Sequence, residues 1–333
     1  MPGGMMNRRP MRDTPRHTRS LDPAAHRAGS SAVELLACLL MAVLTLAVLL
    51  PAVSSARAAA RRTACQNNLF QVTLAVMNYQ ETYAMFPLAC VTRDNEPTTS
   101  GKSWLVSILP FVDQAALYET ITPDGGSIDE FADPTRILDD SLRIDTYRCP
   151  DDVLPNENPF RDGYGTCNYS GNAGGEPLDP TGLGFLRTGW EMPLRYDDRP
   201  TQIERWSKRP SRRRSPAGIF EANQGTRFRD VLDGASNTLL VGERSVHSGG
   251  GLWSGIRGGD HLNDAMTDAS PASRPNSSPT GYSSFHPGAV NLAMADGRVL
   301  LFSDAGAEPQ GAGTPSLLQA ISTRAGSEIV NEF

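Results

Sequence analysis

Apolar residues are unevenly distributed along the chain and define an N-terminal region of three stretches. Residues 1–29 form an Arg-rich head with six Arg and two Asp. A nearly uninterrupted apolar run follows, and its length is that of one membrane-spanning helix, which we place at residues 30–53. In residues 54–85, apolar side chains recur at spacings of three and four, which predicts an amphipathic helix. These positions are Leu69, Val72, Val76, Tyr79 and Tyr83. We therefore expect one long spine helix, which Pro51 can kink.

Residues 86–333 have the composition of a loop-rich exported domain. Turn residues are frequent, since the chain holds 25 Pro and 31 Gly. Two segments are predicted to be loop insertions: residues 205–214 hold six basic side chains, and residues 264–282 are rich in Ser, Pro and Asn. The basic run is typical of a solvated loop, with binding of an anionic surface polymer as the alternative. The predicted fold class is α+β, with a long N-terminal transmembrane and spine helix followed by an antiparallel β-rich domain.

One β-hairpin can be placed within this domain. Asp296-Gly297 stands between two apolar runs, which is the strongest short-range hairpin signal. Pairing Ala295 with Arg298 makes one face of the hairpin wholly apolar, so this is the register that we predict.

Charge distribution indicates the orientation of the chain. Because Lys and Arg are enriched on the cytoplasmic side of membrane segments, the Arg-rich head is expected to stay in the cytoplasm. Residues 1–56 hold six of the 31 basic and three of the 37 acidic side chains, so the remainder carries a net charge of about −9, which argues against a nucleic-acid partner. An ordinary secretory signal has a shorter apolar core without an internal acid. The prediction is a single-pass protein of the inner (cytoplasmic) membrane with its main domain outside the cytoplasm.

Glu34 lies at the start of the apolar run, five residues after Gly29. A charged group inside a membrane segment costs about 2.5–3.5 kcal/mol, so it needs a partner or a place near the interface. One interpretation is a lone acid at the level of the lipid headgroups. The other follows from the order of the Arg-rich head, Gly29, Ser30, Glu34 and the apolar run, which resembles the N-terminus of type IV prepilins and type II secretion pseudopilins.

This resemblance implies both processing and assembly. A prepilin peptidase would cut after Gly29 and methylate the new N-terminus at Ser30, where the family usually has Phe. Glu34 would then be the assembly carboxylate that neutralises the N-terminal ammonium of a neighbouring subunit. The implied partners are the peptidase, other pilin-like subunits and the membrane.

Further short motifs occur in an order that resembles large bacterial families of prepilin-like proteins carrying a domain of unknown function numbered 1559. The closing signature of this resemblance is a His, nine residues and then Asp-Gly, met here by His286, Asp296 and Gly297. The earlier motifs are Cys65-Gln66-Asn67-Asn68-Leu69, Cys149-Pro150 with Asp152, Asp233-Gly234 with Ser236-Asn237-Thr238, and Gly242-Glu243.

His286 and Asp296 cannot form a catalytic pair within one flat hairpin, because a separation of ten residues spans roughly 33 Å when the chain is extended. Asp296 is most simply a turn residue. His286 stands at the entrance of the predicted strand, where it either caps a neighbouring loop or forms a site with Glu243 or His247. A hydrolase that uses these three residues is one alternative. Because no nucleophile, phosphate-binding or metalloprotease motif occurs in the sequence, we do not expect an enzyme.

Cysteine usage is consistent with export. Four cysteines lie outside the apolar run and allow three complete pairings, among which we prefer Cys149 with Cys167. The other two are Cys65 and Cys90. No cysteine or histidine spacing indicates a metal site.

Asp233 and Asn237 belong to an oxygen-rich turn, and calcium stabilises some pseudopilins. The spacing of this turn matches no recognised calcium loop. We therefore expect no cofactor, with Ca²⁺ at this turn as the alternative.

The sequence favours a pseudopilin-like, membrane-anchored subunit of a secretion or pilus-type filament. The alternative is a membrane-anchored extracytoplasmic binding protein that recognises a glycan or another envelope ligand and does not assemble.

Overall fold

The computed structural model describes eight parts of the chain. They are residues 31–92, 101–122, 143–160, 164–175, 218–222, 224–256, 263–309 and 314–326. The proposed cleavage site at Gly29 and Ser30 and the basic run at residues 205–214 lie outside them. The chain divides into two units, residues 1–54 and 55–333.

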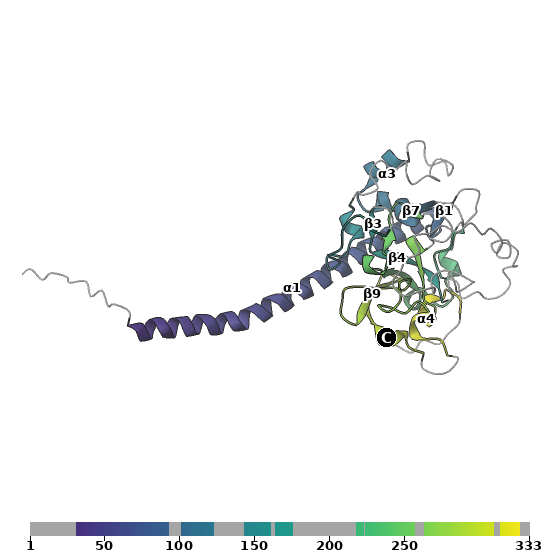
Figure 1. Ribbon diagram of the computed structural model, residues 1–333. Coiled ribbons are helices and arrows are strands. Elements are labelled where there is room, and N and C mark those ends of the chain that lie inside the picture. Colours follow the sequence, from purple (N-terminus) through teal and green to yellow (C-terminus); the bar gives the residue numbers. More distant parts are fainter. Residues whose placement is uncertain are drawn as a thin grey trace, which may run out of the picture. The chain divides into compact units, whose positions relative to one another are not determined.

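The longest element is α1, a helix of 52 residues from Ala32 to Tyr83 (Figure 1). Its start is fixed by a reciprocal pair of hydrogen bonds. The backbone N–H of Ser31 donates to Glu34 Oε2 at 2.9 Å, and the backbone N–H of Glu34 donates to Ser31 Oγ at 3.3 Å. This is a capping box, which satisfies two of the backbone donors that a helix start leaves unpaired. Pro51 lies inside the helix and does not end it.

In the first unit, the helical residues are apolar and exposed. Large apolar side chains from Val33 to Val53 keep roughly half or more of their surface accessible. This stretch is long and apolar enough to cross a membrane, which fits a membrane anchor and also a signal sequence near the N-terminus. Exposed apolar surface of this extent requires lipid or other protein to cover it.

In the second unit, the continuation of α1 contributes one face to the core. Leu69, Val72 and Val76 are completely buried, as their spacing predicts. They belong to a cluster that includes Trp104 and Trp253. Tyr83, at the end of the predicted apolar face, is 55% exposed.

A five-stranded sheet forms the centre of the second unit, in the order β10-β9-β5-β4-β8 (Figure 1). Its neighbours are antiparallel except for β4 and β8, which are parallel. The strands are β4 (Tyr169–Gly174), β5 (Leu239–Glu243), β8 (Met266–Asp268), β9 (Ala289–Met294) and β10 (Val299–Ser303). The predicted α+β class, a long helix followed by an antiparallel-rich sheet, is confirmed.

Smaller elements surround this sheet. Strands β1, β2 and β7 form one small sheet, and β3 and β6 form another. Their bounds are β1 (Cys90–Thr92), β2 (Gly101–Ser103), β7 (Gly255–Ile256), β3 (Thr166–Cys167) and β6 (Gly251–Leu252). The remaining helices are α2 (Trp104–Ser107), η2 (Leu109–Phe111), α3 (Ala115–Ile121), η5 (Asp145–Tyr147), η7 (Phe228–Asp230), η8 (Ala235–Asn237), η9 (Val246–Ser248), η11 (Asp304–Ala307) and α4 (Leu317–Ser322).

The hairpin predicted at Asp296-Gly297 is present, but its predicted register is wrong by one residue. Val299 pairs with Ala293, and the backbone N–H of Met294 donates to the carbonyl of Arg298. The turn therefore has three residues rather than two. Gly297 has a φ of 92°, a left-handed conformation that favours glycine and is typical of three-residue hairpin turns.

The segment at residues 264–282, predicted to be a loop insertion, is part of the folded core. It supplies β8 to the edge of the sheet, and Tyr282 at its end is completely buried. Strand β8 was not predicted, because a strand of three residues is too short to show alternation in the sequence.

Candidate functional site

A disulfide joins α1 to the turn that follows η5. The bridge links Cys65 to Cys149, so the preferred pairing of Cys149 with Cys167 is wrong. Cys167 lies in β3 with its Sγ 3.3 Å from the backbone nitrogen and oxygen of Tyr169, and it is a buried free thiol, as is Cys90. Burial raises the pKa of each free thiol to about 12, so both are protonated.

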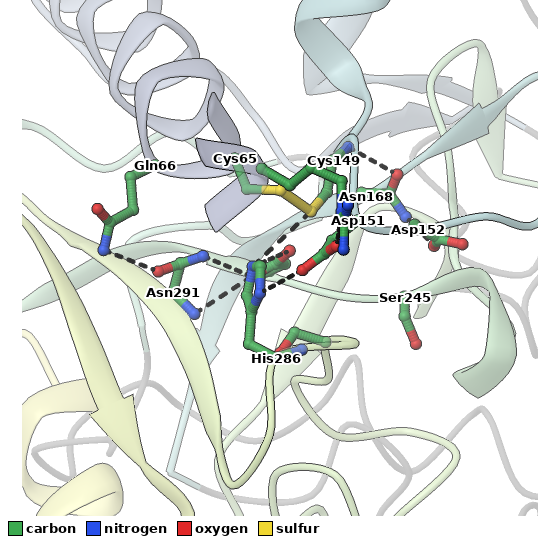
Figure 2. A network of polar contacts seen from close by, with 12 residues as sticks. Cys65, Gln66, Cys149, Asp151, Asp152, Asn168, Ser245, His286 and Asn291 are labelled. Carbon is green, nitrogen blue, oxygen red and sulfur yellow. Dashed lines mark hydrogen bonds and ion pairs between the residues drawn. A yellow bond between two sulfur atoms is a disulfide. The ribbon is translucent and has the colours of Figure 1, made fainter. Parts of the chain in front are cut away.

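His286 lies against this bridge, in the loop before β9 (Figure 2). Its Nε2 is 3.9 Å from Cys149 Sγ and 3.6 Å from Glu243 Oε1. Its Nδ1 is 3.0 Å from Asp151 Oδ2, within ion-pair distance. The side chain of His286 is 1% exposed, so the ring is enclosed by these groups.

Glu243, the last residue of β5, reaches the site from the sheet. Its Oε2 accepts hydrogen bonds from the side-chain amide of Asn291 at 2.9 Å and from the backbone N–H of Asn291 at 3.3 Å. The side-chain oxygen of Asn291 in turn accepts from Gln66 Nε2 of α1 at 3.3 Å (Figure 2). These contacts direct the other carboxylate oxygen, Oε1, toward His286.

Burial determines the charge of this pair. It raises the pKa of Glu243 to about 8, and the two hydrogen bonds from Asn291 only partly oppose this effect. Burial also lowers the pKa of His286, although the nearby Asp151 favours the protonated ring. At neutral pH, the site therefore holds an uncharged carboxylic acid and an uncharged imidazole beside the disulfide.

Asp152 fixes the turn that carries Cys149 and Asp151. Its Oδ2 accepts from the amide of Asn168 at 2.6 Å and from the backbone N–H of Val246 at 2.9 Å. The side-chain oxygen of Asn168 accepts from the backbone N–H of Cys149 at 3.0 Å. Figure 2 shows the contact between Cys149 and Asn168 beside the bridge, with Asp152 next to Asn168. The turn is thus held in position by Asn168, which lies between β3 and β4, and by the backbone of Val246 in η9.

His247 does not join the cluster, although the sequence left it open as a partner of His286. It is exposed in η9, and its ring centroid lies 6.4 Å from that of Phe285. His247 and His286 do border one cavity of about 320 Å³. The other residues that line it are Ser245, Ser248, Asn276, Ser283, Ser284, Phe285, Pro287 and Gly288.

The remaining candidate residues have local structural contacts. Asp233 Oδ2 accepts from the hydroxyl of Thr323 at 3.2 Å and from the backbone N–H of Gly326 at 2.7 Å. The side-chain amide of Asn237 donates to the backbone carbonyl of Asp233. Asp296 Oδ1 accepts from the backbone N–H of Arg298 within the hairpin turn, as expected for a turn residue.

Comparison with protein families gives one match. Residues 54–306 match the family described as protein of unknown function (DUF1559). The chain belongs to this family. No curated protein and no solved structure matches it. The DUF1559 match covers the whole cluster from Cys65 to His286, while α1 begins before it.

Several groups of the DUF1559 site were not identified from the sequence. Asp151 and Asn291 contact His286 and Glu243, but nothing in their spacing indicated a role. Gln66 was noted only as part of a family motif, without a role. Arg244 is completely buried after β5 and donates to the carbonyls of Ser248 and Pro279. The capping box of Ser31 and Glu34 was also missed, although a Ser followed three residues later by a Glu is a recognisable signal of a helix start.

Proposed function

We propose that this DUF1559 protein is a pseudopilin-like subunit, processed by a prepilin peptidase after Gly29, methylated at Ser30 and assembled into a secretion or pilus-type filament. In this proposal it is inserted once in the inner membrane, with the head in the cytoplasm and residues 55–333 outside. Its partners are the peptidase, the membrane and other pilin-like subunits, and its role is assembly rather than catalysis.

The observation that carries the proposal is an acid in the first turn of a helix whose apolar side chains are exposed. One carboxylate oxygen of Glu34 accepts from Ser31, and within the described residues the other oxygen makes no hydrogen bond. It is therefore available to a cationic group, such as the N-terminal ammonium of a neighbouring subunit. The helix dipole also favours a negative charge at this end.

The capping box suggests a sharp test of this role. Glu34→Gln removes the charge but keeps a side chain that can complete a capping box, since Gln serves at this position as well as Glu. Glu34→Ala removes both. If Glu34 pairs with an ammonium, both variants should fail to enter sheared filament fractions. If Glu34 only caps the helix, Glu34→Gln should assemble normally, which would contradict the proposal.

Processing is tested on the same protein. Mass spectrometry of the N-terminus of membrane-purified chain should detect N-methylated Ser30. An intact Arg-rich head, or a cut close to Ser55, would refute prepilin processing.

A second candidate function is an anchored extracytoplasmic binding protein. The cavity beside His286 favours it, because serine hydroxyls, an amide and the partly exposed ring of Phe285 are groups that bind sugars. In that case, Phe285→Ala should abolish binding to envelope glycans, while Glu34→Gln should leave it unchanged.

A further inference from the structure

Four potential metal ligands meet at the Cys65–Cys149 bridge. One ligand atom each from Cys65, Cys149, Glu243 and His286 lies within 4.8 Å of all the others, and all four residues are buried. Cys65 comes from α1, Cys149 from the turn after η5, Glu243 from β5 and His286 from the loop before β9. Because these segments are far apart in the sequence, no short motif identifies the four ligands. Two of the distances around His286 Nε2, 3.6 Å and 3.9 Å, are close to the roughly 3.3–3.8 Å that separates ligand atoms in tetrahedral zinc sites.

We propose that the reduced form of this protein binds one zinc-like divalent cation through Cys65, Cys149, Glu243 and His286, and that the disulfide is the closed, metal-free state of the same site. This inference does not depend on filament assembly.

The surroundings of His286 are those of a metal-binding histidine. Such a ring usually directs its second nitrogen to a carboxylate, which fixes the ring and leaves the other nitrogen facing the metal. Here Asp151 lies 3.0 Å from Nδ1, and Nε2 faces Cys149 and Glu243. A disulfide alone needs no such arrangement, because its sulfurs are weak hydrogen-bond acceptors.

The carboxylate of Glu243 is likewise oriented by its neighbours. Asn291 holds Oε2 with two hydrogen bonds, so Oε1 is the oxygen left to face the cluster. The protein thus supplies all four positions of a tetrahedral site, with two sulfurs, one nitrogen and one oxygen. A buried site with four protein ligands and no open position is typical of structural rather than catalytic zinc.

The local charge also fits a site with two thiolates and a carboxylate. These ligands carry three negative charges, and a divalent cation leaves one uncompensated. Arg62 is close enough to His286 to lower the pKa of its ring, and within the described residues Arg62 Nε is buried without a hydrogen-bond acceptor. Its positive charge can offset the remaining negative charge.

Opening the site requires a two-electron reduction. A dithiol transfers two electrons and two protons to the bridge, the S–S bond breaks to give two thiols, and the dithiol becomes a disulfide. Binding of the cation then releases the two thiol protons and the acid proton of Glu243. The sulfurs separate to roughly 3.8 Å, as two Zn–S bonds of about 2.3 Å at a tetrahedral angle require.

The test uses full-length protein in detergent. Wild-type chain is reduced with dithiothreitol, freed of it under anaerobic gel filtration and titrated with Co²⁺, whose thiolate complexes absorb strongly in the near ultraviolet. The reduced chain should bind one Co²⁺ with this absorption and lose it to Zn²⁺, whereas the oxidised chain should show neither. This comparison needs no variant, so it is independent of any folding defect.

Variants then assign the ligands. Glu243→Gln and His286→Ala should each weaken Co²⁺ binding by at least tenfold, and Asp151→Asn by about 10–100-fold through the orientation of His286. Cys90→Ala with Cys167→Ala removes two buried thiols outside the cluster and should leave binding unchanged. A reduced wild-type chain without the thiolate absorption would overturn the proposal. So would equal Co²⁺ affinity in Glu243→Gln, His286→Ala and wild type.

Discussion

Removal of the Cys65–Cys149 bridge should destabilise residues 55–333 strongly. The bridge joins residues 84 apart in sequence. In the chain-entropy model, closing a loop of this length lowers the entropy of the unfolded chain enough to stabilise the folded state by about 4.5 kcal/mol. This is a large fraction of the roughly 5–15 kcal/mol that keeps a typical domain folded. We therefore expect the double variant Cys65→Ala with Cys149→Ala to unfold at a much lower urea concentration.

Urea unfolding of the full chain in detergent, with a metal chelator present, measures this effect. Trp104 and Trp253 are completely buried, so their fluorescence reports the loss of the core. The matched control is Cys90→Ala with Cys167→Ala, which removes two buried thiols but no bridge. Each Cys→Ala substitution should lower the free energy of unfolding by about 1 kcal/mol because of lost packing. This loss is common to both double variants, so the difference between them gives the contribution of the bridge.

A difference below about 1 kcal/mol would refute the reasoning, because it would mean that the loop is already constrained in the unfolded chain. Chemical reduction of the wild-type chain should reproduce the double variant. If only the variant is destabilised, the cause is the lost side chains rather than the open loop.

Three further changes test the site and the sheet around it. Burial raises the pKa of Glu243 from 4.5 to about 8, so its contribution to stability is fully present below pH 4.5 and is lost as pH rises to 8. Glu243→Gln should flatten the last part of this fall, at most about 2 kcal/mol, in unfolding measured from pH 6.5 to 8. Gly242→Ala should cost about 1–3 kcal/mol in thermal unfolding, since its new Cβ would lie 2.3 Å from the ring of Tyr282. Asp152→Ala should accelerate amide hydrogen exchange at Val246 and cost about 2–3 kcal/mol, because the buried N–H loses its acceptor.

Each change has a matched control. The lowered pKa of His286 opposes the trend of Glu243 only below about pH 6.5. Burial lowers the pKa of Lys102 to about 8, so that group opposes the trend mainly above pH 8, which is why the range ends there. At Gly175 a new Cβ meets nothing closer than 3.5 Å, so Gly175→Ala should be nearly neutral. Asp152→Asn keeps an acceptor for Val246 and should be milder than Asp152→Ala. Equal effects in either pair would contradict the structural explanation.

Local signals in the sequence predicted α1 and the hairpin, but not the short helices α2, α3 and α4. The spacing of Leu69, Val72 and Val76 identified the buried face of α1, and Asp296-Gly297 located the hairpin. The register of the hairpin was wrong because a three-residue turn and a two-residue turn share the same Asp-Gly signal, and only the backbone conformation of Gly297 separates them.

The site depends on contacts between distant segments, which explains what the sequence could not determine. Glu243 and His286 were both recognised as candidates, but their meeting follows from the pairing of β5 with β9, which no spacing encodes. The disulfide was assigned wrongly because nearness in sequence favoured Cys167, whereas Cys65 is brought to Cys149 by the packing of α1 against the domain.

The bridge also determines how the second unit responds to mechanical load. Cys65 lies ten residues beyond the unit boundary at Ser55, so a pull on the N-terminal helix passes through a covalent link into the turn that holds Cys149. Residues 66–148 are bypassed by that path. While the disulfide is closed, stretching the chain cannot release the roughly 280 Å of length that these residues would have when extended. When a subunit is pulled by its anchor, the end of α1 and the elements from β1 to α3 would thus stay outside the force path.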